Sequence, residues 1–296
     1  MIERIIDISD EPAKLTVWLE QLVIERGENK TTIPLVEIAS VVVSNPQVTF
    51  SHPALSGIAS KGASLIVCDE KHMPVGLLLP IHLHSTQTER IAKQANAPQP
   101  KRKRLWQQII KAKVSAQAKL LQQLHGKDFG LSKMAEFVKS GDSDNIEGQA
   151  SRIYWQNIFA DTTFVRRRDA EDQNRHLNYG YAVLRAITAR AICAAGLHPS
   201  IGIHHHNRYD AFCLASDLME PFRPIVDRSV AMWIKEHDPL TPLDKHAKSA
   251  VIAPLIARYD LDGESRTLFD IMSRVASSLA LVYMGEREKL LLPTLL

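Results

Sequence analysis

The sequence predicts an α+β protein with a small N-terminal β-sandwich domain, residues 1–80, followed by a larger all-helical C-terminal domain, residues 81–296. Two observations support this division. Short runs of β-branched and apolar residues, separated by turn residues, fill the first part. After Pro80, long segments with helical periodicity follow one another to the end of the chain. Hydrophobic residues make up 45% and charged residues 23% of the 296 residues, which is typical of a folded protein with a buried core.

The β-rich part contains four segments that predict strands. They are "KLTVWLEQLVIERG", "TTIPLVEIASVVVSN", "SLIVCDE" and "VGLLLPI", at residues 14–27, 31–45, 64–70 and 75–81. One short helix is expected between them, where Ser51 can cap the first turn, Pro53 fits within it and Gly62 ends it. Several short strands spaced by turns are typical of a sandwich, and this predicts the small β domain.

The helical part contains long amphipathic segments that end at glycine. Examples are "RLWQQIIKAKVSAQAKLLQQLHG", "YAVLRAITARAICAAG" and "LFDIMSRVASSLALVYMG". Their final residues, Gly126, Gly196 and Gly285, stand where a helix C-cap is expected.

Composition excludes several classes of protein. Three widely separated cysteines without a CxxC pair argue against a disulfide framework or a cysteine-rich zinc site. No apolar run approaches the roughly 20 residues of a membrane span. The acidic start "MIERIIDISDEP" lacks the features of a signal peptide, so we expect a cytoplasmic protein without a membrane partner. A net charge of +3 permits nucleic-acid binding without requiring it.

Two basic clusters are candidates for contact with a DNA backbone, and we select Lys103 and Arg167 from them. The clusters are Lys101, Arg102, Lys103 and Arg104, and Arg166, Arg167 and Arg168. Adjacent cations bind phosphates and release counterions. The alternative is a solvated loop or the basic start of a surface helix, and the sequence leaves both open.

The stretch "GIHHHNRYDAFCLASDLME" places three histidines upstream of two acids. In an extended chain His204 and His206 would share one face and His205 the other. Asp217 and Glu220 have the i, i+3 spacing that places both on one side of a helix turn. A capping box also explains these two acids, without any function.

A second pair of acids, Asp144 and Glu147, repeats this spacing, and a capping box is again the simple explanation. Gly148 follows directly, although glycine inside a helix costs about 1 kcal/mol relative to alanine. A glycine here indicates that another group approaches the backbone closely.

Four motifs occur in an order that identifies a family. They are "EGQASRIYW", "NRHLNYGYAVLRA", "GIHHHNRYDAF" and "DLMEPFRPIVDR". Together they closely resemble the CRISPR-associated integrase, the catalytic subunit of spacer acquisition called CRISPR-associated protein one. The last two motifs are most similar to the branch found with single-effector, type II systems. The resemblance spans essentially the whole chain, and that family also has an N-terminal β domain and a helical C-terminal domain.

The resemblance implies a set of site residues. The family's metal-binding glutamate falls on Glu147, its histidine on His205 and its last acid on Glu220, while Asp217 matches an auxiliary acid. Two carboxylates and an imidazole favour Mg²⁺ or Mn²⁺ over zinc. We assign Arg223 to a DNA phosphate, with a salt bridge to Asp217 or Glu220 as the alternative.

The resemblance also implies a function. It is a metal-dependent DNA integrase and endonuclease of CRISPR adaptation, joining 3′-hydroxyl ends of spacer DNA to the repeat array by phosphodiester transesterification. The alternatives are a structure-specific metal-dependent nuclease and a non-catalytic DNA-binding scaffold. The implied partners are double-stranded DNA, a second copy of the chain joined through the β domain, and the second small adaptation protein. The effector nuclease and an accessory adaptation subunit are further implied partners.

Overall fold

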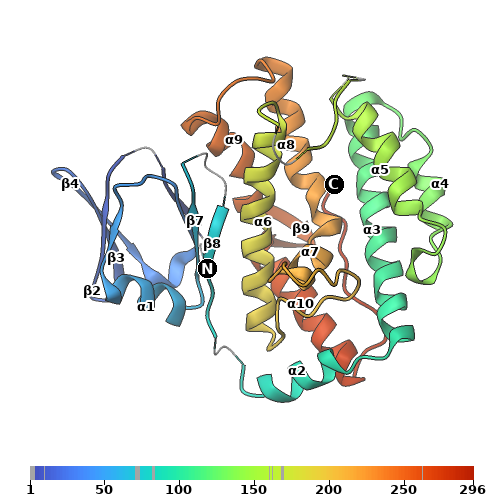
Figure 1. The fold of residues 1–296 in the computed structure, drawn as a ribbon, viewed down its shortest axis with the longest axis horizontal. Helices are drawn as coiled ribbons and strands as arrows, with labels where there is room; N and C mark the ends of the chain where they lie inside the picture. Colours follow the sequence, from blue (N-terminus) through green and yellow to red (C-terminus); the bar gives the residue numbers. More distant parts are fainter. Residues whose placement is uncertain are drawn as a thin grey trace.

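The computed structural model describes residues 4–9, 11–70, 74–81, 84–159, 161, 163–167, 170–261 and 263–296. Most strands lie in the first part of the chain and most helices in the rest, so the predicted α+β class is confirmed (Figure 1).

The first sheet has the strand order β1–β5–β7–β8. Its strands are β1 (Arg4–Ile8), β5 (Ile38–Val43), β7 (Ser64–Cys68) and β8 (Pro74–Leu78). The pairs β1–β5 and β5–β7 are parallel, whereas β8 runs antiparallel to β7. All six residues of β5, "IASVVV", are buried, because this central strand is covered on both faces.

The second sheet has the order β4–β3–β2–β6. Its strands are β4 (Asn29–Pro34), β3 (Gln21–Arg26), β2 (Lys14–Trp18) and β6 (Thr49–Phe50). The segment 14–27 forms a hairpin, not one strand, because the chain turns at Leu19 and Glu20, whose φ values are 45° and 59°. The expected helix is present as α1 (His52–Ser60), with the Ser51 hydroxyl accepting the N–H of Ala54 at 3.3 Å.

The first sheet lies between two hydrophobic clusters. One of its faces shares buried side chains with the second sheet and α1. Ala39, Val42 and Ile66 belong instead to the cluster of the helical part, and α6 (Asn174–Ala194) packs against β5 and β7. The first sheet therefore packs against the helical part through α6, which lies between the strands and the other long helices (Figure 1).

The remaining helices confirm the periodicity of the sequence. They are α2 (Gln87–Ala95), α3 (Gln99–His125), α4 (Leu131–Glu136), α5 (Ile146–Asn157), α7 (Cys213–Leu218), α8 (Arg223–Glu236), α9 (Lys245–Ile256) and α10 (Leu268–Met284). Gly126 and Gly285 end α3 and α10 in the left-handed conformation, with φ of 71° and 83°.

The expectation of an all-helical C-terminal part is wrong. Strands β9 (Arg258–Leu261) and β10 (Glu264–Thr267) form an antiparallel hairpin between α9 and α10. Each strand has four residues, which is too short to show a strand period in the sequence.

The cysteines behave as the sequence indicates. Cys68, Cys193 and Cys213 are free thiols, and burial raises the pKa of Cys68 and of Cys193 to about 11. Among the helices of the described ranges, none combines the length and apolarity that crossing a membrane requires.

Candidate metal centre and DNA-binding site

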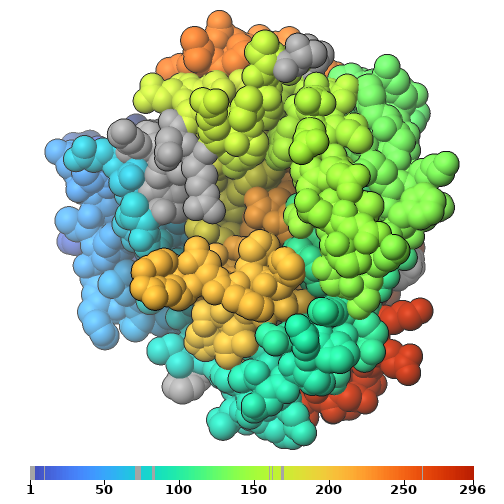
Figure 2. Space-filling view, turned by 45° about the vertical axis from the view of Figure 1, so that its right-hand side comes forward, coloured from blue at the N-terminus to red at the C-terminus, as the bar shows by residue number. Residues whose placement is uncertain are grey.

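The candidate site lies where α3, α5 and the junction between α7 and α8 meet. A single 3₁₀ turn, Glu220–Phe222, connects α7 to α8 and contacts α3. Pro221 within this turn and Pro224 at the start of α8 fit the first turn of a helix, where no N–H bond is lost. The break between the two helices directs Glu220 toward α3. The face that carries the site is hollowed between the gold segment around residue 210 and the green residues of α5 (Figure 2).

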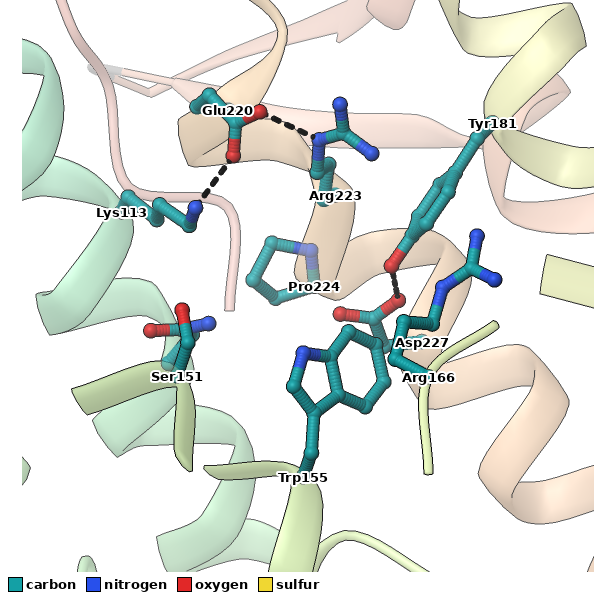
Figure 3. Close-up of a pocket in the computed structure, with 10 residues that line it drawn as sticks. Lys113, Ser151, Trp155, Arg166, Tyr181, Glu220, Arg223, Pro224 and Asp227 are labelled. Carbon is teal, nitrogen blue, oxygen red and sulfur yellow. Dashed lines mark hydrogen bonds and ion pairs between the residues drawn. The ribbon is translucent and has the colours of Figure 1, made fainter. Parts of the chain in front are cut away.

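Glu147 and Glu220 share one cation, the ammonium of Lys113. Lys113 Nζ lies 2.6 Å from Glu147 Oε1. The same Nζ lies 2.6 Å from Glu220 Oε2, and Arg223 Nε lies 2.9 Å from Glu220 Oε1 (Figure 3). Burial alone would raise the pKa of Glu220, but the charges of Arg223 and Lys113 outweigh it and lower that pKa below its ordinary value. Glu220 is therefore a buried, ionised carboxylate held by two cations.

Sequence reasoning missed Lys113. Burial lowers the pKa of its ammonium, but the carboxylates of Glu220 and Glu147 outweigh burial and raise it, so the group stays charged. The available signal was its position on α3, because Lys113 falls on the same helical face as the buried residues Trp106, Ile110 and Gln117.

His205 is anchored by Asp217, an acid with a fully buried side chain. The Asp217 carboxylate binds His205 Nδ1 and accepts the backbone N–H groups of Ile203 at 2.6 Å, His204 at 2.9 Å and His205 at 3.3 Å. The hydrogen bond to Asp217 raises the pKa of His205 against the effect of burial, and the charges of Glu220 and Glu147 raise it further.

Glycine is required where this loop begins. A Cβ at Gly202 would lie 2.3 Å from the carbonyl oxygen of His205 and 3.1 Å from Asp217 Oδ2. Only the absent side chain allows the backbone to close over the carboxylate.

The expected alternation of the three histidines is wrong. The His204 ring stacks on the buried indole of Trp106, with centroids 4.3 Å apart and an interplanar angle of 4°. The His205 ring meets the same indole edge-on at 5.7 Å. The backbone here is not extended, because three consecutive N–H groups donate to Asp217 and the loop bends around its carboxylate.

The capping explanation for Asp217 and Glu220 is also wrong. Asp217 lies inside α7, and its carboxylate binds the loop of residues 203–205. Glu220 forms ion pairs with Lys113 and Arg223.

The start of α5 is capped by different residues from those expected. Asn145 is the N-cap, and its side-chain oxygen accepts the N–H of Gly148 at 3.2 Å, while Asp142 accepts the N–H of Glu147 at 3.0 Å. A Cβ at Gly148 would lie 2.7 Å from Asn145 Oδ1. The group that approaches the Gly148 backbone is thus the cap itself. Asp144 is exposed and takes no part, so the Glu147 side chain is free to reach α3.

A third buried acid, Asp227, connects the helices around the site. The Tyr154 hydroxyl of α5 donates to Asp227 Oδ2 at 2.7 Å, and the Tyr181 hydroxyl of α6 donates to Oδ1. Burial raises the pKa of Asp227 to about 6, against the two hydroxyls and the nearby arginines. Arg223 and Arg166 lie over the Tyr181 ring, at 4.6 and 5.3 Å from its centroid.

These groups surround a cavity of about 220 Å³. Its lining residues are Lys113, Gln117, Ser151, Trp155, Arg166, Tyr181, Glu220, Arg223, Pro224 and Asp227 (Figure 3). Two arginines beside a carboxylate centre are suited to hold a phosphodiester.

The donor set fits a hard divalent ion. A single atom, Lys113 Nζ, lies 2.6 Å from an oxygen of each glutamate, so both carboxylates reach one common point, and they must draw closer to give the 2.0–2.1 Å bonds of Mg²⁺. Because His205 Nδ1 is bound to Asp217, its other nitrogen, Nε2, is the atom that would be available to an ion, and a carboxylate partner of this kind is usual for metal-binding histidines. In the described part of the chain no three His, Cys, Asp or Glu side chains are already arranged to hold an ion.

The basic clusters divide into structural and exposed members. Residues 101–104 lie in the first turns of α3, and Lys101 Nζ donates to the Val282 carbonyl at 3.1 Å. Lys103 is exposed. Arg167 is exposed too, while Arg166 donates to Asn178 Oδ1 at 2.6 Å. Arg168 lies outside the described residues.

Comparison with known proteins assigns the family. The model of the family "CRISPR associated protein Cas1" matches residues 7–239. The chain belongs to the Cas1 family. The CRISPR-associated endonuclease Cas1 of Neisseria meningitidis is 33% identical over 287 residues, covering 96% of this chain and 93% of the relative. A Cas1 endonuclease of Francisella tularensis is 26% identical, and the match covers 90% of this chain and 92% of the relative.

Solved structures share the Cas1 fold. A Cas1 protein from Thermotoga maritima superposes with a TM-score of 0.79 at 19% identity, covering 97% of this chain and 99% of that one. A casposase bound to its integration product superposes with a TM-score of 0.78, also at 19% identity, covering 98% and 92%.

Proposed function

We propose that this member of the Cas1 family is a metal-dependent DNA integrase and endonuclease of CRISPR adaptation, which joins 3′-hydroxyl ends of spacer DNA to a repeat array. The observation that carries the proposal is the pair Glu147 and Glu220, which converges on one buried cation beside Arg223. The names of the relatives support the endonuclease activity, and the casposase with its integration product supports the joining activity.

In this proposal Glu147, His205 and Glu220 hold Mg²⁺ or Mn²⁺. The ion supplies Lewis acidity to the attacking 3′-hydroxyl and to the phosphate oxygens. Asp217 fixes the orientation of the His205 ring. Arg223, whose Nε is paired with Glu220, presents its remaining N–H groups to a phosphate oxygen in the adjoining cavity. The nucleophile is a DNA end, so no side chain forms a covalent bond to the substrate.

The proposed assembly extends beyond the site. Residues 1–80, with two sheets facing one hydrophobic cluster as in a sandwich, are proposed to form a homodimer, and Lys103 and Arg167 to contact the DNA backbone. A Cas6-RT-Cas1–Cas2 complex (TM-score 0.77, 19% identity, covering 99% of this chain and 36% of that one) supports Cas2 as the small partner. A Cas1–DNA complex with a TM-score of 0.58 supports DNA as a partner, and the double-stranded form rests on the family resemblance. An effector nuclease and an accessory adaptation subunit rest on the family resemblance alone.

The test is strand joining by the purified chain with its small partner and Mn²⁺. A duplex with 3′-hydroxyl ends should be joined to a plasmid that carries the repeat. Glu147→Ala and His205→Ala should abolish joining, while Asp144→Ala, which removes an exposed acid one turn from Glu147, should retain it. Joining by both site variants at the wild-type rate would contradict the proposal.

The same assay separates the alternatives. With a blocked 3′-end, a nuclease that acts by hydrolysis continues to cleave, whereas joining stops. A scaffold binds DNA equally well with and without a chelator, and its binding falls steeply with salt.

A further inference from the structure

Lys113 contacts both Glu147 and Glu220, but it has no role in the proposed chemistry. We propose that Lys113 is an internal counter-cation of this centre, which holds Glu147 and Glu220 together and moves to Gln117 when a divalent ion binds. The inference rests on the proposed function, because it assumes that these two glutamates are metal ligands.

The first support is the geometry of the shared ammonium. Its two partner oxygens, Glu147 Oε1 and Glu220 Oε2, each lie 2.6 Å from Nζ. A divalent ion bound to the same oxygens would stand next to the ammonium, and two like charges in a buried site repel strongly. The ion and the ammonium therefore compete for one position.

The second support is that the side chain of Lys113 can move while α3 stays in place. Ile109, Ile110 and Val114 flank it on α3 and are completely buried in the main hydrophobic cluster. A close-packed interior does not let the helix shift. The lysine side chain, in contrast, has four rotatable bonds and lines the cavity of about 220 Å³.

The third support is an acceptor one turn away. Gln117 follows Lys113 at i+4, on the same face of α3, and lines the same cavity. Its side-chain oxygen Oε1 is buried and has no hydrogen-bond partner among the described residues. A buried acceptor without a donor costs free energy, so a cation that arrives there is stabilised.

The experiment is a Mn²⁺ titration of the full chain without DNA, in which free Mn²⁺ is followed by electron paramagnetic resonance. Lys113→Met should bind Mn²⁺ about tenfold more tightly than the wild type, because the competing charge is gone. Lys119→Met, which removes an exposed lysine of the same helix, is the matched control and should bind as the wild type does. Equal or weaker binding by Lys113→Met would overturn the inference, since a purely structural lysine would not tighten binding when removed.

Gln117→Leu tests the second position. It should weaken Mn²⁺ binding severalfold, because the displaced ammonium then has no acceptor. Unchanged binding would contradict the movement to Gln117.

Stability of Lys113→Met gives a second readout. Without its ammonium, the paired glutamates repel, so this variant should be less stable than the wild type in chelator and should be stabilised more by Mn²⁺. A variant that folds only with Mn²⁺ supports the inference, and one that stays unfolded in Mn²⁺ contradicts it. If Glu147→Ala and Glu220→Ala bind Mn²⁺ as the wild type does, the proposed function fails. If these two variants lose Mn²⁺ binding but Lys113→Met does not bind Mn²⁺ more tightly, this inference alone fails.

Discussion

Glu220 and Asp227 are buried carboxylates seven residues apart in one motif, and they are neutralised in opposite ways. Glu220 lies between the cations Lys113 and Arg223, which lower its pKa below the ordinary value against the effect of burial. Asp227 lies between two tyrosine hydroxyls, and its pKa is raised to about 6. The same residue chemistry thus gives a carboxylate with a lowered pKa at one position and a more readily protonated carboxylate at the other.

The difference assigns the two acids to different tasks. A carboxylate that is held by exchangeable cations can exchange them for a metal ion. A carboxylate that is held by hydroxyls from α5 and α6 joins these helices to α8, and so fixes the elements that carry Glu147 and Arg223. We therefore expect Glu220 to control chemistry and Asp227 to control stability.

The largest expected effect is on Glu220→Gln, which keeps the shape of the side chain and removes its charge. Strand joining should fall by about 10²–10³-fold or more, because the ion loses a charged ligand. The rate is measured with the Mn²⁺ joining assay, with circular dichroism to check the fold. Asp144→Asn, at an exposed acid, is the control. A tenfold loss or less would remove the distinction between the two acids.

The second effect is a pH dependence of stability that belongs to Asp227. Its pKa is about 6 in the folded protein and near 4 in the unfolded chain, so the folded state binds the proton more tightly. Protonation of Asp227 therefore stabilises the fold by about 3 kcal/mol. This contribution is complete below about pH 4 and is lost as the pH rises through 6.

Urea unfolding of the wild type and of Asp227→Asn at pH 4 to 7 measures this effect. The difference between their free energies of unfolding should change by about 3 kcal/mol across this range. The change is a loss of stability of the wild type, relative to the variant, as the pH rises. A constant difference would mean that Asp227 keeps its ordinary pKa.

The third effect concerns Asp217, which is held by backbone N–H groups. Asp217→Asn should lower joining about 10–100-fold, the usual result of removing the partner of a metal-binding histidine. The pKa of His205 should fall, because the hydrogen bond that its ring donates to the Asp217 carboxylate is the main cause of the increase. Nuclear magnetic resonance titration of the His205 ring measures this change, and an unchanged pKa would show that Asp217 does not set the charge of His205.

The smallest effect is expected for Tyr181→Phe, which removes one hydroxyl donor to Asp227. The free energy of unfolding should decrease by about 1–2 kcal/mol. Tyr154→Phe, at the other donor, should behave alike in the same urea experiment. If neither variant is destabilised, the hydroxyls are not what stabilises the buried acid.

Hydrophobic periodicity was sufficient to predict that a β-rich part precedes a helical part, because buried faces repeat along each long element, but it missed β1 and β6. It failed for β9 and β10, which are too short to show a period, and at Leu19, where a turn interrupts what looks like one strand. These local features depend on tertiary contacts that the sequence pattern does not contain.

The candidate site was predictable only in part. Family motifs singled out Glu147 and Glu220, and the structure brings both to one buried cation. Lys113 and Gln117 were missed because a single lysine or glutamine on an apolar helix face has no partner in the local sequence. Capping spacing was misleading at Asp217, because the groups it binds lie twelve to fourteen residues earlier in the chain.

The most direct test is a crystal of the protein soaked in Mn²⁺, with anomalous scattering to locate the ion. The account predicts a peak about 2.1 Å from an oxygen of Glu147 and of Glu220, with His205 as the third ligand and the Lys113 ammonium displaced. A saturating soak that leaves Lys113 between the two glutamates, with no peak there, would contradict it.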